Sequence, residues 1–170
     1  MIKFLLKYFG LFVLLVLLQE FFFSNIQLSG FLNPYVYILF VLMLPMKTPR
    51  WLMLVSAFLL GLSVDLFADT LGFHAFATTL LAFVRPNVIA LFTSRDDYGQ
   101  GPIPSLAGYG LPWFLRYAGV CILIHHFTLF YLEAFTFHGF FFTLFRIIIS
   151  SVFTLIIIVL SQLLFYKGNT

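Results

Sequence analysis

Charged side chains are scarce in this chain of 170 residues, where Lys, Arg, Asp and Glu together make up only 9%. Six residues are acidic, whereas 62% of the chain is hydrophobic and its mean hydropathy is +1.09. Because a soluble globular domain carries about 25% charged residues, this composition excludes that class. The net charge of +3 is small and implies no nucleic-acid partner. The composition therefore predicts an integral membrane protein.

Cysteine and long polar segments are also nearly absent. The single cysteine, Cys121, lies inside an apolar run, so a disulfide framework and a Cys-based metal site are excluded. The longest polar segment, residues 93–112, is rich in Gly and Pro and reads as an irregular loop. The chain thus has no room for a soluble catalytic domain, and we expect residues 1–170 to form a single domain.

Apolar runs, in contrast, are abundant. We expect all-α membrane spans at residues 4–23, 31–44, 51–68, 71–92, 113–132 and 139–166. The run 31–44 is shorter than the ~17 to 25 residues that a crossing helix usually needs, so a re-entrant segment is the alternative there. The sequence predicts a bundle of six transmembrane helices.

Basic loop residues decide between these topologies. With a cytoplasmic N-terminus and six crossings, one side of the membrane receives Lys3, Lys7, Lys47, Arg50, Arg95 and Lys167. The three loops on the other side contain no Lys or Arg. Without the second crossing, Lys47 and Arg50 would lie outside, against the positive-inside rule. We therefore predict a multi-pass protein with both termini in the cytoplasm.

Four ionisable side chains within the predicted spans are expected to share one layer. At a rise of ~1.5 Å per residue, Asp65 and His126 lie roughly 20 Å above the inner boundary. Glu20 lies roughly 24 Å above it, and Arg146 lies roughly 10 Å below the outer surface. Since a lone charge at this depth is costly, such groups usually face the bundle interior and pair. We expect Arg146 to pair with Asp65.

Helical spacing predicts polar stripes that face the interior. Gly61, Asp65 and Asp69 follow at i, i+4 and i+8, and Gly61 is small enough for a neighbouring helix to approach closely. His126 and Glu133 are seven residues apart on one face of the fifth run. A third stripe in the last run consists of Thr143, Arg146, Ser150 and Thr154. These stripes fit helix packing, or else a path for a ligand or for protons.

Catalytic and metal sites are less well supported. Asp65 and Asp69 could hold a divalent cation as some membrane transferases do, but no second acidic motif accompanies them. Four histidines fall in the outer half: His74, His125, His126 and His138. His125 and His126 are about 100° apart on a helix and cannot chelate like an i, i+4 pair. We predict a protein that is not an enzyme and has no metal or cofactor.

Several motifs together resemble the rod-shape-determining MreD family, in the variant found in Bacteroidetes-like members. The resemblance covers nearly the whole chain and rests on the order and spacing of its motifs. They are Asn33-Pro34, Gly61 to Phe67, Leu71 to Ala75, Arg85-Pro86, the Gly/Pro-rich loop, His125-His126 with Glu133, and Arg146 with Ser150.

The resemblance implies a non-enzymatic inner-membrane component of the cell-elongation machinery, which organises peptidoglycan synthesis. Its implied partners are the scaffold MreC and, indirectly, the filament MreB, the elongation-specific transglycosylase and the penicillin-binding transpeptidase. The implied fold is similar to the substrate-binding subunits of energy-coupling-factor transporters, so a vitamin-binding transporter subunit is the alternative. Docking would use helix surfaces in the lipid, with Gly61, Gly119 and the long last run as candidate contacts.

Overall fold

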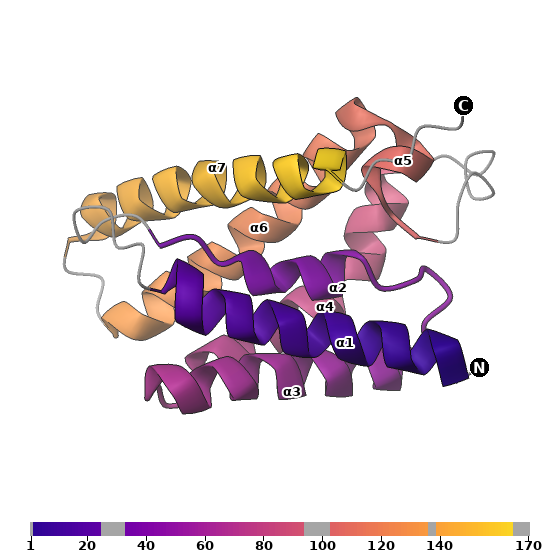
Figure 1. Ribbon diagram of the computed structural model, residues 1–170. Helices are drawn as coiled ribbons and strands as arrows, with labels where there is room; N and C mark the ends of the chain where they lie inside the picture. Colours follow the sequence, from indigo (N-terminus) through magenta and orange to yellow (C-terminus); the bar gives the residue numbers. More distant parts are fainter. Residues whose placement is uncertain (1, 25–32, 94–102, 136–138, 165–170) are drawn as a thin grey trace.

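The computed structural model describes residues 2–24, 33–93, 103–135 and 139–164, and it is all-helical, with no strand in these ranges. The predicted loop positions Arg95, His138 and Lys167 lie outside the described residues. The helical elements are α1 (Ile2–Leu18), a π-helical turn (Gln19–Phe23), a 3-10 turn (Val36–Ile38), α2 (Leu39–Leu42), α3 (Arg50–Ala68), α4 (Phe73–Phe92), α5 (Leu106–Tyr109), α6 (Leu111–Ala134) and α7 (Phe140–Leu164) (Figure 1).

Five helical stretches are long and apolar enough to cross a membrane. They are Leu6–Phe23, Arg50–Ala68, Phe73–Phe92, Leu111–Ala134 and Phe140–Leu164. Large apolar side chains project from them, such as Leu66 and Phe141, which are 77% and 84% exposed. Such an apolar exterior is compatible with lipid as the surrounding solvent and with a multi-pass membrane protein. Five of the six predicted runs are thereby confirmed as apolar helices of spanning length.

The run predicted at 31–44 does not form one long helix. Its described part, residues 33–44, is here called the central segment: it is extended up to Tyr35 and then helical only from Val36 to Leu42. Pro34 and Pro45 bound this stretch, and proline disfavours helix in the residue before it and in the interior. A helix between two prolines so close together is too short to span a membrane.

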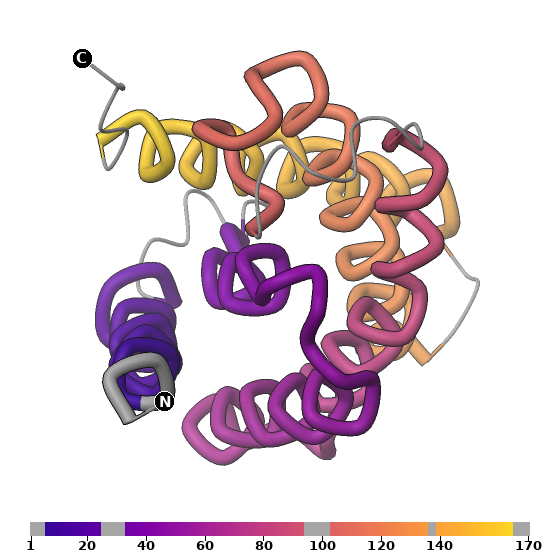
Figure 2. The backbone as a smooth tube through the Cα atoms, turned by 90° about the vertical axis from the view of Figure 1, so that its right-hand side faces the viewer, coloured from indigo at the N-terminus to yellow at the C-terminus, as the bar shows by residue number. Residues whose placement is uncertain are grey.

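The central segment lies in the interior of the bundle. Every residue from Pro34 to Leu42 is buried, and Tyr37, Ile38, Val41 and Leu42 are fully buried. Viewed along the bundle, the segment is surrounded by the long helices (Figure 2). Irregular backbone at membrane depth is tolerated only where protein covers it and satisfies its polar groups. This requirement explains the contacts described below.

Because the helices alternate in direction, the acidic residues and several of the basic residues lie at opposite ends of the bundle. α1 begins at the same end of the bundle at which α7 finishes (Figure 1). That end carries the basic side chains Lys7, Lys47, Arg50 and Arg116 and is called the basic end. The opposite end, called the acidic end, carries all four acidic residues of the described ranges: Glu20, Asp65, Asp69 and Glu133.

Helices α3 and α4 form the tightest pair, and Gly61 lies at their closest approach. A Cβ atom added to Gly61 would lie 2.4 Å from the carbonyl oxygen of His74 and 2.5 Å from Cα of Ala75. The close approach expected at Gly61 is therefore present. A Cβ on Gly119 would lie 4.0 Å from Leu155 of α7. Gly61 is buried between α3 and α4, whereas Gly119 is half-buried, and a contact of Gly119 with a partner helix stays a prediction.

Candidate functional site

The extended start of the central segment is held by Gln19, in the π-helical turn that follows α1. The Gln19 Nε2 group donates to the carbonyl of Pro34 at 3.1 Å, and the backbone N–H of Val36 donates to Gln19 Oε1 at 2.9 Å. The side chain is only 2% exposed. A single amide thus satisfies one acceptor and one donor of backbone that has no helical partner there. Sequence analysis did not select Gln19.

Two hydroxyl groups of α7 hold the same stretch from the other side. The N–H of Asn33 donates to Ser150 Oγ at 3.3 Å, and the N–H of Tyr35 donates to Thr154 Oγ1 at 3.2 Å. Ser150 and Thr154 are fully buried. These hydroxyl groups of the stripe predicted on the last run therefore face the interior and bind backbone of the central segment.

The turn between α3 and α4 is organised by Asp65. Its carboxylate accepts the N–H groups of His74 at 3.1 Å and Ala75 at 2.8 Å, the Nδ1–H of His74 at 3.0 Å, and the hydroxyl of Thr70. These N–H groups belong to the first turn of α4, which has no helical acceptor for them. The predicted pair of Asp65 with Arg146 is not formed, because His74 is the ion-pair partner of Asp65.

Aromatic and imidazole rings fill the layer between Asp65 and α7. Tyr37 Oη and His125 Nε2 share a hydrogen bond of 2.8 Å, and His126 Nε2 lies 3.2 Å from Thr154 Oγ1. The ring of Tyr35 packs against His126 at a centroid distance of 5.4 Å. Both histidines are fully buried. They serve as interhelical hydrogen-bonding groups, as the packing hypothesis expected.

Arg146 contacts an aromatic ring and not the carboxylate of Asp65. Its Cζ lies 4.8 Å from the ring centroid of Phe130, which is within the range of a cation–π interaction. Its Nε atom is buried with no hydrogen-bond partner in the described part of the chain. Asp65 and His126 also bind residues outside the predicted layer, so the pairing expected among Glu20, Asp65, His126 and Arg146 is not found in the described contacts.

A polar cavity of about 400 Å³ lies at the acidic end. Its polar lining residues come from three helical elements and the loops beside them: Gln19, Glu20, Ser24, Asn33, Thr70, His74 and Glu133. Glu20 Oε1 is buried there without a hydrogen-bond partner among the described residues. Of the predicted site residues, Glu20, His74 and Glu133 meet at this cavity, whereas Asp69 is exposed at the end of α3. This cavity is the candidate functional site.

A second buried group, at the basic end, was missed by sequence analysis. Arg85 is 2% exposed, and its Nε donates to Tyr117 Oη at 2.8 Å. Its Nη2 donates to the carbonyls of Leu44 and, at 3.4 Å, Leu42, where α2 ends. Tyr117 Oη also donates to Leu42 at 3.0 Å. A charge inside an apolar span is itself a signal of a site. Sequence analysis used Arg85-Pro86 only as one motif of the resemblance.

The chemistry available at the cavity is hydrogen bonding and electrostatic attraction. Two carboxyl groups, Glu20 and Glu133, face a neighbouring His74, and amide and hydroxyl groups complete the lining. No three His, Cys, Asp or Glu side chains within the described ranges are placed to hold a metal ion.

No family model matches this chain, and neither does a curated protein or a solved structure.

Proposed function

We propose that this protein is a non-enzymatic inner-membrane component of the bacterial cell-elongation complex, similar to the MreD family. In this proposal the chain crosses the membrane six times with both termini in the cytoplasm, and the central segment is the second crossing. It docks the scaffold MreC and through it serves MreB and the elongation-specific transglycosylase and transpeptidase. The resemblance in sequence motifs is the origin of the proposal.

One observation carries the proposal: the motif residues of that resemblance contact one another. Asp65 binds His74, and the backbone of Asn33 binds Ser150. Gly61 lets α4 approach at Ala75. Asn33 and Ser150 are far apart in the chain, whereas the other contacts join α3 to the start of α4. Together these contacts hold the helices and the central segment in one arrangement. Motifs that maintain a helix arrangement, and not a reactive centre, are what a docking subunit requires.

The docking surface would consist of lipid-facing helix sides, because the described residues include no domain outside the bundle. α7 offers the longest such side, a stripe of exposed apolar residues: Phe141, Phe145, Ile148, Val152, Ile156, Leu160 and Leu163. Their spacing of three and four residues keeps them on one face. A helix of the scaffold could pack along this face by van der Waals contact.

The alternative is a membrane subunit that binds a small polar molecule, with the fold of a transporter's substrate-binding subunit. The cavity at the acidic end favours it, since about 400 Å³ of space is lined by Glu20, Glu133 and His74. Ligand sites of this size usually combine a few convergent polar groups with a preformed cavity. A vitamin-like compound with a cationic group would suit the two carboxylates.

One pair of variants distinguishes these functions. In the docking proposal, Ile148→Asn/Val152→Asn on the exposed side of α7 should abolish co-purification of MreC and cause loss of rod shape, because an unpaired amide on this face disrupts packing in lipid. Glu20→Gln/Glu133→Gln should preserve both. The ligand-binding proposal expects the reverse: the carboxylate variant loses saturable binding of a vitamin-like compound, and the α7 variant keeps it. Retention of MreC by both variants would contradict docking on this face.

A further inference from the structure

A small cavity at the basic end gathers three cationic residues. It has a volume of about 250 Å³ and lies where the loop before α3 meets the middle of α4. Its lining includes Lys47, Thr48, Arg50 and Arg85 and contains no acidic side chain. Lys47 and Arg50 are exposed, whereas Arg85 is buried. The cavity is therefore strongly positive at its base and open to the surface at its rim.

The charge of Arg85 is not neutralised by any described carboxylate. All the hydrogen-bond partners found for its guanidinium are neutral: the hydroxyl of Tyr117, the sulfur of Met53 and two backbone carbonyls. A buried charge is costly unless it is paired. The first turn of α3, next to this cavity, also has no side-chain cap, so its N–H groups add positive potential. The site is built to receive an anion.

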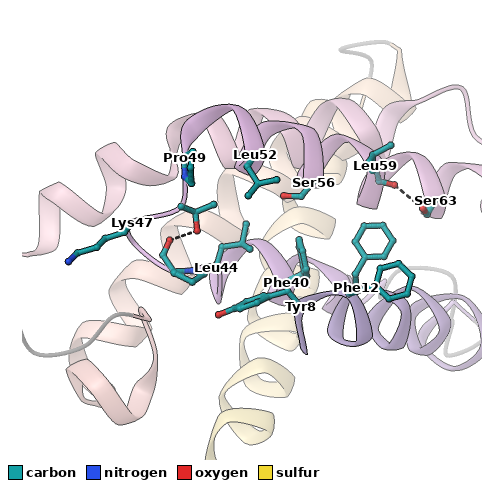
Figure 3. A pocket seen from close by; sticks show the side chains of 13 residues that line it. Tyr8, Phe12, Phe40, Leu44, Lys47, Pro49, Leu52, Ser56, Leu59 and Ser63 are labelled. Carbon is teal, nitrogen blue, oxygen red and sulfur yellow. Dashed lines mark hydrogen bonds between the residues drawn. The ribbon is translucent and has the colours of Figure 1, made fainter. Parts of the chain in front are cut away.

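An apolar groove begins beside this cavity. It has a volume of about 660 Å³ and runs between α1 and α3, past Phe12, Phe40, Leu52 and Leu59 (Figure 3). Lys47 and Thr48 line both the groove and the cationic cavity, so the two are continuous. Lys47 lies at one end of the groove and extends away from it (Figure 3).

The length and apolar lining of the groove suit a hydrocarbon chain. The groove follows α3 from Pro49 to Ser63, which is roughly 21 Å at 1.5 Å per residue. A chain anchored at the membrane surface needs about 15 Å to reach the midplane.

We propose that this protein binds an anionic phospholipid, with the phosphate in the cavity formed by Lys47, Arg50 and Arg85 and an acyl chain in the groove between α1 and α3. Basic pockets between helices on the cytoplasmic side of a membrane recognise anionic headgroups. The site is separate from the cavity at the acidic end and from the exposed face of α7. The lipid would hold α1 against α3 and supply the counter-charge that Arg85 lacks.

The charge requirement can be tested on the purified full chain by native mass spectrometry with phosphatidylglycerol and phosphatidylcholine. We expect selective retention of phosphatidylglycerol. Lys47→Gln/Arg50→Gln should weaken it about tenfold or more, since each basic residue near the surface contributes to attraction of an anionic lipid. The matched control Lys7→Gln/Arg116→Gln removes two exposed charges from the same end and should retain the lipid. Equal retention of the two lipids, or equal loss in both double variants, would overturn the proposal.

The acyl-chain requirement needs a variant that fills the groove. Ser56 lines it, and its hydroxyl donates to the carbonyl of Met53. Ser161 of α7 is half-buried, makes the same kind of bond to Ile158 and does not line the groove. Ser56→Phe should reduce phosphatidylglycerol retention severalfold, whereas Ser161→Phe should not.

Two further results would contradict the lipid assignment. Displacement of phosphatidylglycerol by millimolar inorganic phosphate would indicate a site for a soluble anion that needs no hydrocarbon chain. Loss of a protein partner in Ser56→Phe, with lipid retention unchanged, would assign the groove to a partner helix instead.

Thermal unfolding of each variant in detergent should match that of the parent chain, because none of the substituted residues is buried.

Discussion

Gly61→Ala should destabilise the bundle by about 3 kcal/mol, one of the two largest losses that we expect from a single substitution. The added methyl group would lie 2.4 Å from the carbonyl oxygen of His74 and 2.6 Å from the backbone nitrogen of Ala75. Backbone atoms cannot rotate away as a side chain can, so α3 and α4 must separate. Thermal unfolding in detergent, followed by circular dichroism, would measure the loss.

Two other glycines serve as controls for Gly61. Gly10 has no neighbour within 4 Å of an added Cβ, and Gly119 has one side-chain atom at 4.0 Å. Because alanine is the better helix former, Gly10→Ala and Gly119→Ala should leave the midpoint unchanged or raise it slightly. If Gly61→Ala were as stable as these two, the close crossing of α3 and α4 would be contradicted.

Asp65→Ala should have a comparable effect, a loss of about 3 to 5 kcal/mol, because it leaves a buried network without its acceptor. The carboxylate accepts hydrogen bonds from the N–H groups of His74 and Ala75, from His74 Nδ1 and from Thr70. Asp65→Asn keeps one acceptor oxygen and should lose less. Asp69→Asn is the matched control, since Asp69 is exposed on the same helix and asparagine tolerates its left-handed backbone.

A double-mutant cycle would identify the partner of Asp65. Side chains in direct contact show coupling energies of about 0.5 to 3 kcal/mol, whereas separate sites add within about 0.5 kcal/mol. We expect measurable coupling between Asp65→Ala and His74→Phe, and additive losses for Asp65→Ala with Arg146→Leu. Strong coupling to Arg146 in the same unfolding assay would restore the pair that helical spacing had predicted.

The failure of that predicted pair has a physical cause. Depth along a helix follows from counting residues, and Asp65 and Arg146 do belong to the same half of the bundle. Partner choice depends instead on helix rotation and on the loops. Asp69 takes a left-handed conformation with a φ of 54°, and Gly72 does the same at 89°. Because of this tight turn, His74 lies beside Asp65, which is only nine residues earlier in the chain. The carboxylate therefore has an ion-pair partner without one from another helix.

The second apolar run, residues 31–44, is another case in which the sequence did not predict the contacts that form. Its length and its two prolines argued against a regular helix, and the basic residues after it argued for a crossing. Neither argument could reveal that Gln19, Ser150 and Thr154 satisfy its extended backbone. In the sequence, none of these side chains differs from other polar residues of its helix. Each finds a backbone partner only because the central segment lies between α1 and α7.

Composition and apolar run length, read along the chain, were enough to predict an all-helical protein with six apolar runs, five of which are long helices, and to predict that basic residues gather at one end. Those properties depend on the free energy of transferring each segment to lipid and are local. The two cavities, the buried Arg85 and the partners of Asp65 were decided only when the helices packed. Each of them requires groups from separate segments to meet, and lipid offers no other partner for a polar atom once it is buried.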